Sequence, residues 1–331
     1  MNTIGRIFRV SVLGESHGEC VGALLHGCPA GMKLAENNFA KDIARRKPGA
    51  KGTTARRESD APRIMSGVFE GRTTGAPLLI LFDNRDADSS AYDKIRKMPR
   101  PGHADFVAQA KYGGFNDHRG GGHFSGRLTL PLVAAGVVAK KIASPAKVVA
   151  RIIEIGGEAD HDKGLKRALR DGDSVGGIVE CRAKGLPVGL GEPFFDSVES
   201  VLSHALFAIP AVKGVEFGAG FGAARMLGSE CADEFSSIEG KTATNHAGGV
   251  HGGITNGNEL VFRIAVKPTS TIKKPKRTID LAKGKLATVA YEGRHDACIA
   301  LRVPVIVEAV TAIVLADLML INQERPRVAE G

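Results

Sequence analysis

Apolar and polar positions alternate along this chain in short segments, and the period of each segment predicts a strand or a helix. Residues 6–13 (RIFRVSVL) have the spacing of a strand, whereas Phe39 and Ile43 lie four residues apart and predict a helix that ends at Pro48 and Gly49. Strands are predicted at 6–13, within 19–31 before a closing turn, and at 66–71, 76–84, 146–157, 176–185 and 258–268. Helices are predicted at 36–49, 102–114, 127–143, 162–170, 196–210 and 299–321, and a surface loop at 84–100.

The order of these elements favours an α+β fold with substantial antiparallel sheet, because strands and helices mix without strict β-α-β alternation. No proline- or serine-rich linker and no repeat divides the chain, so we expect residues 1–331 to form a single domain. The longest apolar run, residues 303–321, is interrupted by Pro304, Glu308 and Asp317. We expect it to form a buried helix and not a membrane span.

Charge narrows the class of partner. The chain has 45 basic and 36 acidic residues and a net charge of +9, which suggests an anionic partner. Nucleic-acid binding usually adds aromatic stacking residues or a known module, and neither is evident. The basic residues stand in short groups beside glycine and histidine, in loops that hold many of the 42 glycines. This favours a small anionic molecule, with a nucleic acid or a membrane surface as the alternatives.

The cysteines point to a reducing compartment. There are five, an odd number, and none stands in a C-x-x-C motif. A disulfide framework or a zinc site is therefore not expected, and no metal site is predicted. The N-terminal residues MNTIGRIFRV lack the apolar core of a signal peptide. We expect a cytoplasmic protein.

The segment GESHG at 14–18 matches the G-x-S-x-G pattern of a hydrolase nucleophile elbow. In such an enzyme several strands precede the serine and a helix follows it, whereas here one strand precedes Ser16 and a second strand is predicted after it. A serine hydrolase that uses Ser16 is therefore the weaker interpretation, and Ser16 is expected to make a local hydrogen bond. His17, between a polar residue and a glycine, is the stronger candidate for chemistry.

Four further loops carry histidine, arginine or hydroxyl side chains beside glycine or proline. They are RPGHADF with Arg100 and His103, GGGHFSGR with Ser125 and Arg127, KPTSTIKKP with Lys267 and Thr269 to Thr271, and GRHDA with Arg294 and Asp296. Singly, each is more often structural, as a turn histidine, an edge-strand exit or a helix cap. Together they predict a site for two anionic molecules, with histidines available as general acids near neutral pH.

In their order along the chain, these segments closely resemble the chorismate synthase family. The matching segments are NTIGRIFRVSVLGESHG, RRKPG, SGVFEGRTTGAPL, RPGHADF, IPAVKGVEFGAGF, GGVHGGITNG, VKPTSTI and GRHDACIALRVPVIVEA. The resemblance implies the conversion of 5-enolpyruvylshikimate 3-phosphate to chorismate and phosphate, an anti 1,4-elimination that needs reduced FMN without net redox change. It also implies a cytoplasmic homotetramer with a β-α-β sandwich fold, in which antiparallel sheets surround helices.

The resemblance also implies roles for individual residues. His17 is expected to protonate the leaving phosphate, His103 to protonate the reduced flavin near N1, and Asp296 to lie near flavin N5. Flavin contacts are expected from His123, Phe124, Ser125, Pro210, Ala211, Gly252, Lys267, Pro268, Thr269, Ser270, Thr271 and Arg294. Arginines that bind substrate or NADP are expected at Arg45, Arg46, Arg100 and Arg127, and NADPH is a candidate source of electrons.

One segment departs from the family pattern. Many members read RSSARET where this chain reads HFSGRLT, at residues 123–129. Ser125 and Arg127 are retained, whereas His123 replaces an arginine, so His123 and Phe124 are expected to reach the flavin by backbone groups.

Overall fold

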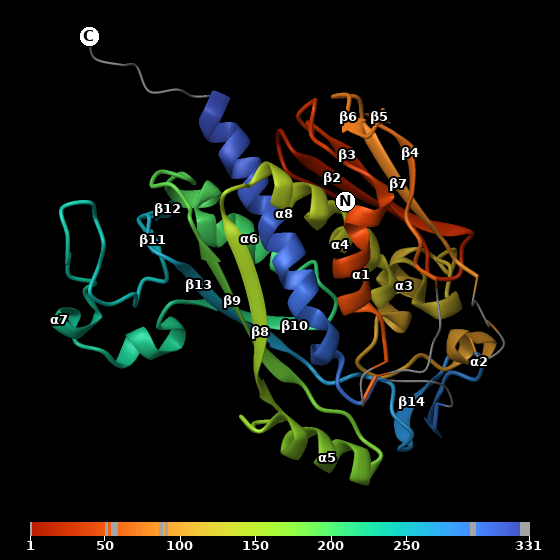
Figure 1. Ribbon diagram of the computed structural model, residues 1–331. Helices are drawn as coiled ribbons and strands as arrows, with labels where there is room; N and C mark the ends of the chain where they lie inside the picture. Colours follow the sequence, from red (N-terminus) through yellow and green to blue (C-terminus); the bar gives the residue numbers. More distant parts are fainter. Residues whose placement is uncertain are drawn as a thin grey trace.

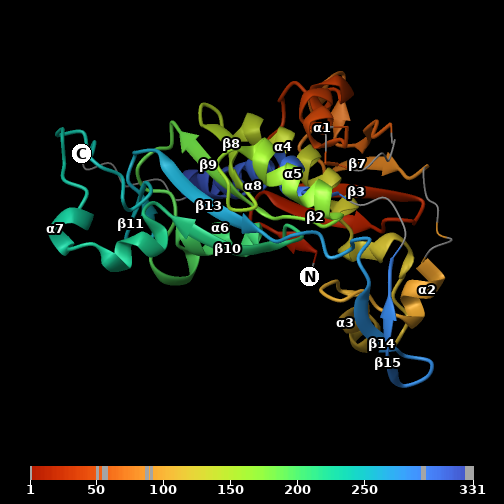
Figure 2. The ribbon, with the colours of Figure 1, turned by 90° about the horizontal axis from the view of Figure 1, so that it is seen from below.

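Two antiparallel sheets lie on either side of a pair of apolar helices in the computed structural model (Figures 1 and 2). The structure describes residues 2–49, 52–53, 59–85, 89, 92–291 and 296–324. This arrangement is the α+β fold and the β-α-β sandwich expected from the sequence. The helices at its centre are α4 (Thr129–Ile142) and α8 (Val303–Glu324).

Both sheets combine pairs of strands that are adjacent along the chain with pairs that are distant along it. The first sheet has the order β1 (Thr3–Ile4), β2 (Arg9–Gly14), β3 (Cys20–His26), β7 (Leu78–Asp83) and β4 (Arg63–Ser66). The second has the order β10 (Val212–Phe217), β13 (Leu260–Val266), β9 (Gly177–Lys184) and β8 (Lys147–Ile155). All pairs are antiparallel, so the predicted predominance of antiparallel sheet is confirmed.

Shorter elements lie at the two ends of the sandwich. At one end lie α7 (Gly228–Cys231) and the hairpin of β11 (Val250–His251) and β12 (Ile254–Thr255). At the other lie α2 (Tyr92–Lys97), α3 (Asp105–Lys111) and the hairpin of β14 (Lys276–Asp280) and β15 (Lys285–Val289) (Figures 1 and 2). The remaining elements are α1 (Ala40–Arg46), α5 (His161–Asp171), α6 (Val198–Leu206), the pair β5 (Val68–Phe69) and β6 (Arg72–Thr73), and six 3₁₀ turns.

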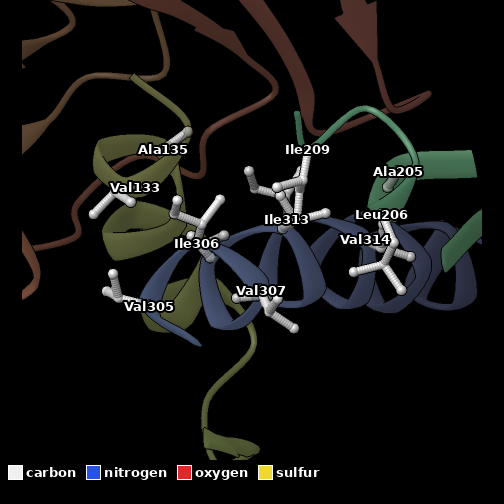
Figure 3. Close-up of a cluster of buried hydrophobic side chains, with 14 of the residues drawn as sticks. Val133, Ala135, Ala205, Leu206, Ile209, Val305, Ile306, Val307, Ile313 and Val314 are labelled. Atoms are coloured by element: carbon white, nitrogen blue, oxygen red, sulfur yellow. The ribbon is translucent and has the colours of Figure 1, made fainter. Parts of the chain in front are cut away.

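The helices α4 and α8 are apolar on all sides because neighbours cover them on all sides. Figure 3 shows part of this core, where Val133 and Ala135 of α4 and Leu206 and Ile209 of the α6 segment surround Ile306 and Ile313 of α8. At the crossing of the two helices, a Cβ on Gly136 would lie 2.3 Å from the Cβ of Ala309. Only glycine permits this approach of the two backbones.

The apolar run at 303–321 is the core helix that the sequence predicted. By length and composition alone Ile299–Gln323 could cross a membrane, because an 18-residue stretch of it has a mean hydropathy of 2.2. However, 78% of that stretch is buried inside the protein. Its carboxylates also have partners there. Asp317 accepts hydrogen bonds from the backbone N–H groups of Arg6, Ile7 and Phe8, which anchors the segment before β2 to α8.

Three local predictions were wrong. Residues 84–100 are not all loop, because Tyr92–Lys97 forms α2, whose Ile95 packs on Val289 and Tyr291. The strand predicted at 66–71 is only Val68–Phe69, since Gly67 and Gly71 turn the chain at positive φ on either side. The helix predicted at 196–210 begins at Val198 and ends at Leu206, four residues before Pro210.

Candidate active site

A tight turn between β2 and β3 carries the first candidate residue, His17. Gly14 adopts φ +89°, and a Cβ there would lie 2.2 Å from the carbonyl oxygen of Cys20, so the turn requires glycine. The side-chain amide of Asn84 donates to the carbonyls of Glu15 (3.0 Å) and Gly18 (2.9 Å). The turn that holds His17 is therefore tied to the end of β7.

A run of three glycines brings the two candidate histidines together. Gly120, Gly121 and Gly122 have φ values of 60°, 82° and 53°. A Cβ on Gly120 would lie 2.6 Å from Nε2 of His17, and a Cβ on Gly121 would lie 3.3 Å from Cε1 of His103. His17 and His103 thus contact neighbouring residues of one loop.

Two side chains, Ser89 just before helix α2 and Tyr92 at its start, contact His17. The hydroxyl of Ser89 lies 2.8 Å from Nδ1 of His17, and the ring of Tyr92 meets the imidazole edge to face at 5.2 Å. The guanidinium of Arg100 lies 6.0 Å from the centre of the same Tyr92 ring, within range of a cation–π contact. Tyr92 therefore contacts the His17 ring on one side and, on the other, the Arg100 guanidinium that lies beside His103.

His103 belongs to a compact charged group with Arg100 and Asp105. Nδ1 of His103 lies 2.7 Å from Oδ1 of Asp105. Arg100 binds the same carboxylate through Nε and Nη2, both at 2.8 Å. Burial alone would raise the pKa of Asp105, but the hydrogen bonds from Arg100 and His103 outweigh it and hold that pKa well below its usual range. Asp105 is therefore a carboxylate at any working pH.

The KPTST segment packs against the turn before His103. Lys267 Nζ and Ser270 Oγ both donate to the carbonyl of Gly102, at 2.6 Å, and Arg100 Nη1 donates to Thr271 Oγ1 at 3.4 Å. The carbonyl of Ala211 accepts from the backbone N–H of Lys267 (2.9 Å), which brings Pro210 and Ala211 to the same place. Burial, with Lys213 and Lys276 adding to it, lowers the pKa of Lys267.

Arg46 and Arg127 form a second charged group around the buried Asp60. Arg127 binds Asp60 through Nη1 and donates from Nε to Asn84 Oδ1 at 2.9 Å. Arg46 Nη1 lies 3.8 Å from Asp60, and its Nε donates to Thr129 at 2.9 Å. Asp60 itself has φ 48°, a strained value for a non-glycine residue. Because the Asn84 side chain that accepts from Arg127 also donates to the His17 turn, this group is linked to His17.

Asp296 lies beside the same group. Its carboxylate is buried and accepts from Nη1 of Arg302 at 3.4 Å, and Nε of Arg302 donates to the backbone carbonyl of Arg46. Asp296 is thus linked to Arg46 through Arg302. Arg294, expected near it, lies outside the described residues.

The segment at 123–129 begins with two stacked aromatic rings and continues with a serine that caps the short turn before α4. The rings of His123 and Phe124 stack at 4.3 Å, with Tyr112 against His123 at 5.6 Å. Ser125 Oγ accepts from the backbone N–H of Arg127 at 3.3 Å and so begins the turn that leads into α4. The expected flavin contacts at 123–125 therefore flank the glycine run.

Two expected site residues lie elsewhere within the chain. Arg45 points away from Arg46 and binds Glu308 of α8 through two hydrogen bonds of 2.6 and 2.7 Å. Gly252 lies in the turn between β11 and β12, at the opposite end of the sandwich from α3 (Figures 1 and 2). The structure does not bring either residue to the histidines of the same chain.

The expectation that Ser16 makes a local hydrogen bond with its hydroxyl was wrong. Its Oγ is buried and has no hydrogen-bond partner among the described residues, although its backbone N–H donates to Gly122. The strand β3 follows at Cys20 and no helix follows the turn. These features do not form a nucleophile elbow.

Sequence reasoning missed Asn84, Asp60 and Tyr92. Asn84 is the last residue of the strand predicted at 76–84 and directly follows β7, a position where polar side chains often serve a site. Asp60 lies in a segment without periodicity, and Tyr92 lies in a segment predicted as loop, so neither carried a signal.

Arginines around two buried carboxylates, with two histidines that contact one glycine loop, define an enzyme site for a small anionic substrate. Comparison with known proteins gives the particular family. The chorismate synthase family model matches residues 8–320. A chorismate synthase of Chitinophaga pinensis is 61% identical over 329 residues, 99% of both chains, and one of Thermococcus kodakarensis is 45% identical, over 99% of both.

The fold comparison agrees. A crystal structure of chorismate synthase superposes with a TM-score of 0.74 at 26% identity and covers 96% of this chain and 93% of that one. The chain belongs to the chorismate synthase family. It is therefore a lyase of aromatic amino acid biosynthesis, and its family implies a requirement for reduced flavin.

Proposed function

We propose that the protein converts 5-enolpyruvylshikimate 3-phosphate to chorismate and phosphate by an anti 1,4-elimination that requires reduced FMN. The observation that carries the proposal is the contact of His17 and His103 with the neighbouring glycines Gly120 and Gly121. An elimination of phosphate needs proton donors at the leaving group and at the electron donor, and this loop supplies two candidates at one place.

The residues near His103 fit a phosphorylated flavin. Lys267 and the hydroxyls of Ser270 and Thr271 supply a cation and hydrogen-bond donors of the kind that bind phosphate. Thr269 Oγ1 is buried and has no hydrogen-bond partner within the described part of the chain, and a phosphate oxygen would satisfy it. When bound, the reduced flavin supplies electron density to the substrate and recovers it. Contacts are assigned to His123–Ser125, Pro210, Ala211 and Lys267–Thr271, and to Arg294, which lies outside the described residues; Gly252, at the other end of the sandwich, contributes none within the same chain.

The chain's own residues move protons and bind charge. His17 donates a proton to the departing phosphate, because a protonated phosphate is the better leaving group. When the reduced cofactor is bound, His103 would donate a proton to it, and Asp296 would help it accept the substrate proton. Arg46, Arg100 and Arg127 bind the phosphate and carboxylates, and the buried acids Asp60 and Asp105 hold all three guanidiniums in place beforehand.

The reaction itself is the first test. Purified protein mixed anaerobically with reduced FMN and 5-enolpyruvylshikimate 3-phosphate should release phosphate and develop chorismate absorbance at the same rate. Absence of both products, with folded protein and confirmed flavin reduction, would overturn the proposal. The same mixture in air, with FMN and NADPH but no reductase, tests whether NADPH can serve as the electron source.

The histidines are tested by substitution. His17→Ala and His103→Ala should each lower turnover by about 10- to 10⁴-fold while FMN still binds, in line with the loss of a general acid. His204→Ala, on α6 outside the site, is the matched control and should keep wild-type turnover. Unchanged turnover in either site variant removes that histidine from the mechanism.

We also propose a cytoplasmic homotetramer. Several large apolar side chains are exposed on the single chain, among them Phe195, Phe221, Phe235 and Ile238. Exposed apolar surface of this kind is typical of surfaces between subunits. Light scattering of the eluted protein should give four times the chain mass of 34.8 kDa.

A further inference from the structure

Asp105 makes hydrogen bonds that converge on a short stretch of chain. It begins helix α3, and its carboxylate accepts from the backbone N–H of Arg100 (2.9 Å), from Nε and Nη2 of the same arginine, and from Nδ1 of His103. The carboxylate is largely buried, with 10% of its side chain exposed. One acidic residue thus sets both the turn and the two side chains on it.

The two oxygens of Asp105 have different partners. Oδ2 accepts from the backbone N–H and Nε of Arg100, whereas Oδ1 accepts from Nη2 of Arg100 and Nδ1 of His103. A carboxylate only accepts hydrogen bonds, and the low pKa of Asp105 keeps it in that form. Nδ1 of His103 must therefore carry a proton, and Nε2 is the nitrogen left for exchange.

The position of Arg100 does not distinguish the two ring nitrogens of His103. Its Nη2 lies within hydrogen-bond distance of both, 3.1 Å from Nδ1 and 3.2 Å from Nε2. Arg100 therefore does not select a tautomer. The Cε1–Nε2 edge faces Gly121, on the loop that also contacts His17.

We propose that Asp105 is a positioning residue that holds His103 with its proton on Nδ1 and directs Nε2 toward the glycine loop as the proton-exchanging atom. The proposal rests on the proposed role of His103 as a proton donor. It assigns to Asp105 an orienting function like that of a carboxylate behind a catalytic histidine.

Asp105→Asn tests this with a specific outcome. Two Arg100 donors face Oδ2 and one, Nη2, faces Oδ1, so the amide oxygen takes the Oδ2 position and the NH₂ group takes the position of Oδ1, where it loses the bond from Nη2. The NH₂ group donates to Nδ1, and the neutral imidazole must then carry its proton on Nε2. The ¹⁵N chemical shifts of labelled protein, with the His103 signals assigned by their loss in His103→Gln, report the tautomer directly.

Wild type should show the Nδ1–H tautomer and an exchange-protected Nδ1 proton, and Asp105→Asn should show the Nε2–H tautomer with turnover lowered by about 10²- to 10⁴-fold. Asp105→Glu keeps a carboxylate and should keep the Nδ1–H tautomer. Asp117→Asn is the matched control, because Asp117 lines the same pocket as His103 but pairs with Arg119. It should leave the His103 signals unchanged.

Two results would overturn the proposal. One is an Nε2–H tautomer in the wild type, a measurement that needs no variant to fold. The other is a folded Asp105→Asn protein that retains the Nδ1–H tautomer. The assay of wild-type turnover tests the proposed function, whereas the NMR spectra test Asp105, so the two fail independently.

Discussion

Asn84 joins the charged group of Arg46, Arg127 and Asp60 to the His17 turn although it has no charge itself. Its amide oxygen accepts from Arg127, and its NH₂ group donates to both ends of the His17 turn. An aspartate has the same shape and keeps the acceptor, but it places an oxygen where two carbonyls need a donor. The position of His17 therefore depends on an amide at residue 84.

Asn84→Asp is expected to lower turnover by at least about tenfold, the lower end of a general-acid contribution, because His17 loses its alignment. Steady-state kinetics at saturating substrate measure this. The matched control is Asn37→Asp, an exposed asparagine whose side-chain oxygen accepts a hydrogen bond from Asn38, a role that aspartate can keep. Turnover within twofold of wild type for Asn84→Asp would contradict the assignment.

At the scale of residues, the sequence identifies those candidate site residues whose neighbours along the chain, such as glycines, mark a loop. His17 and His103 stand beside glycines in loops, and this local signal is enough to select them. Asp60 and Asn84 matter because Arg127, far along the chain, folds onto them. Such long-range partners leave no mark in the residues on either side, so they could not be predicted. Arg45 shows the converse, since the motif it shares with Arg46 does not reveal that it faces Glu308.

At the scale of elements, the crossing of α4 and α8 has the least free space. Gly136→Ala should destabilise the protein by about 1–3 kcal/mol, because the new Cβ would lie 2.5 Å from the backbone Cα of Ala309 and the helices must separate. This cost exceeds the gain of about 1 kcal/mol that alanine brings to a helix interior. Urea unfolding followed by circular dichroism measures it.

Gly228→Ala provides the control for that experiment. A Cβ at Gly228 meets no atom within 4 Å and its φ is not positive, so stability should not fall. An equal or smaller loss for Gly136→Ala would show that the two helices do not pack as closely as described.

Periodic elements were predictable and short ones were not. Strands such as β7 alternate buried and partly buried residues along their length, so the pattern of Leu78, Ile80 and Phe82 identifies them. Helix α2 has six residues, too few to show a period, and it is held by the contact of Ile95 with Val289 and Tyr291 of a distant hairpin. Tertiary contact decides such an element, and propensity does not.

At the scale of the whole molecule, Glu308 connects four elements. From α8 it accepts hydrogen bonds from Arg45 of α1, Lys140 of α4 and the backbone N–H of Ala150 in β8. Burial would raise the pKa of Glu308, but these partners lower it below its ordinary value of 4.5. Because folding lowers this pKa, the stabilisation is complete above about pH 4.5 and is lost as the pH falls through the folded value.

Glu308→Gln should therefore lower the free energy of unfolding by about 1–3 kcal/mol at pH 7, with a smaller difference from wild type at pH 4. Urea unfolding at both pH values measures it. Glu158→Gln removes a carboxylate that is 40% exposed and paired with Lys163, against 4% for Glu308, and should cost less than about 1 kcal/mol. Equal effects of the two variants would contradict the connecting role of Glu308.

The central position of α8 has a consequence for biosynthesis. The inner faces of both sheets, with Phe82 on β7 and Val179 on β9, are complete before residues 303–324 leave the ribosome. Until then the second sheet, whose β8 and β9 pack on α8, has an apolar face with its covering helix missing, the kind of surface that chaperones bind. The two layers can close only after translation has passed α8, so a ribosome that stalls before residue 303 should hold a chain that remains bound to chaperones.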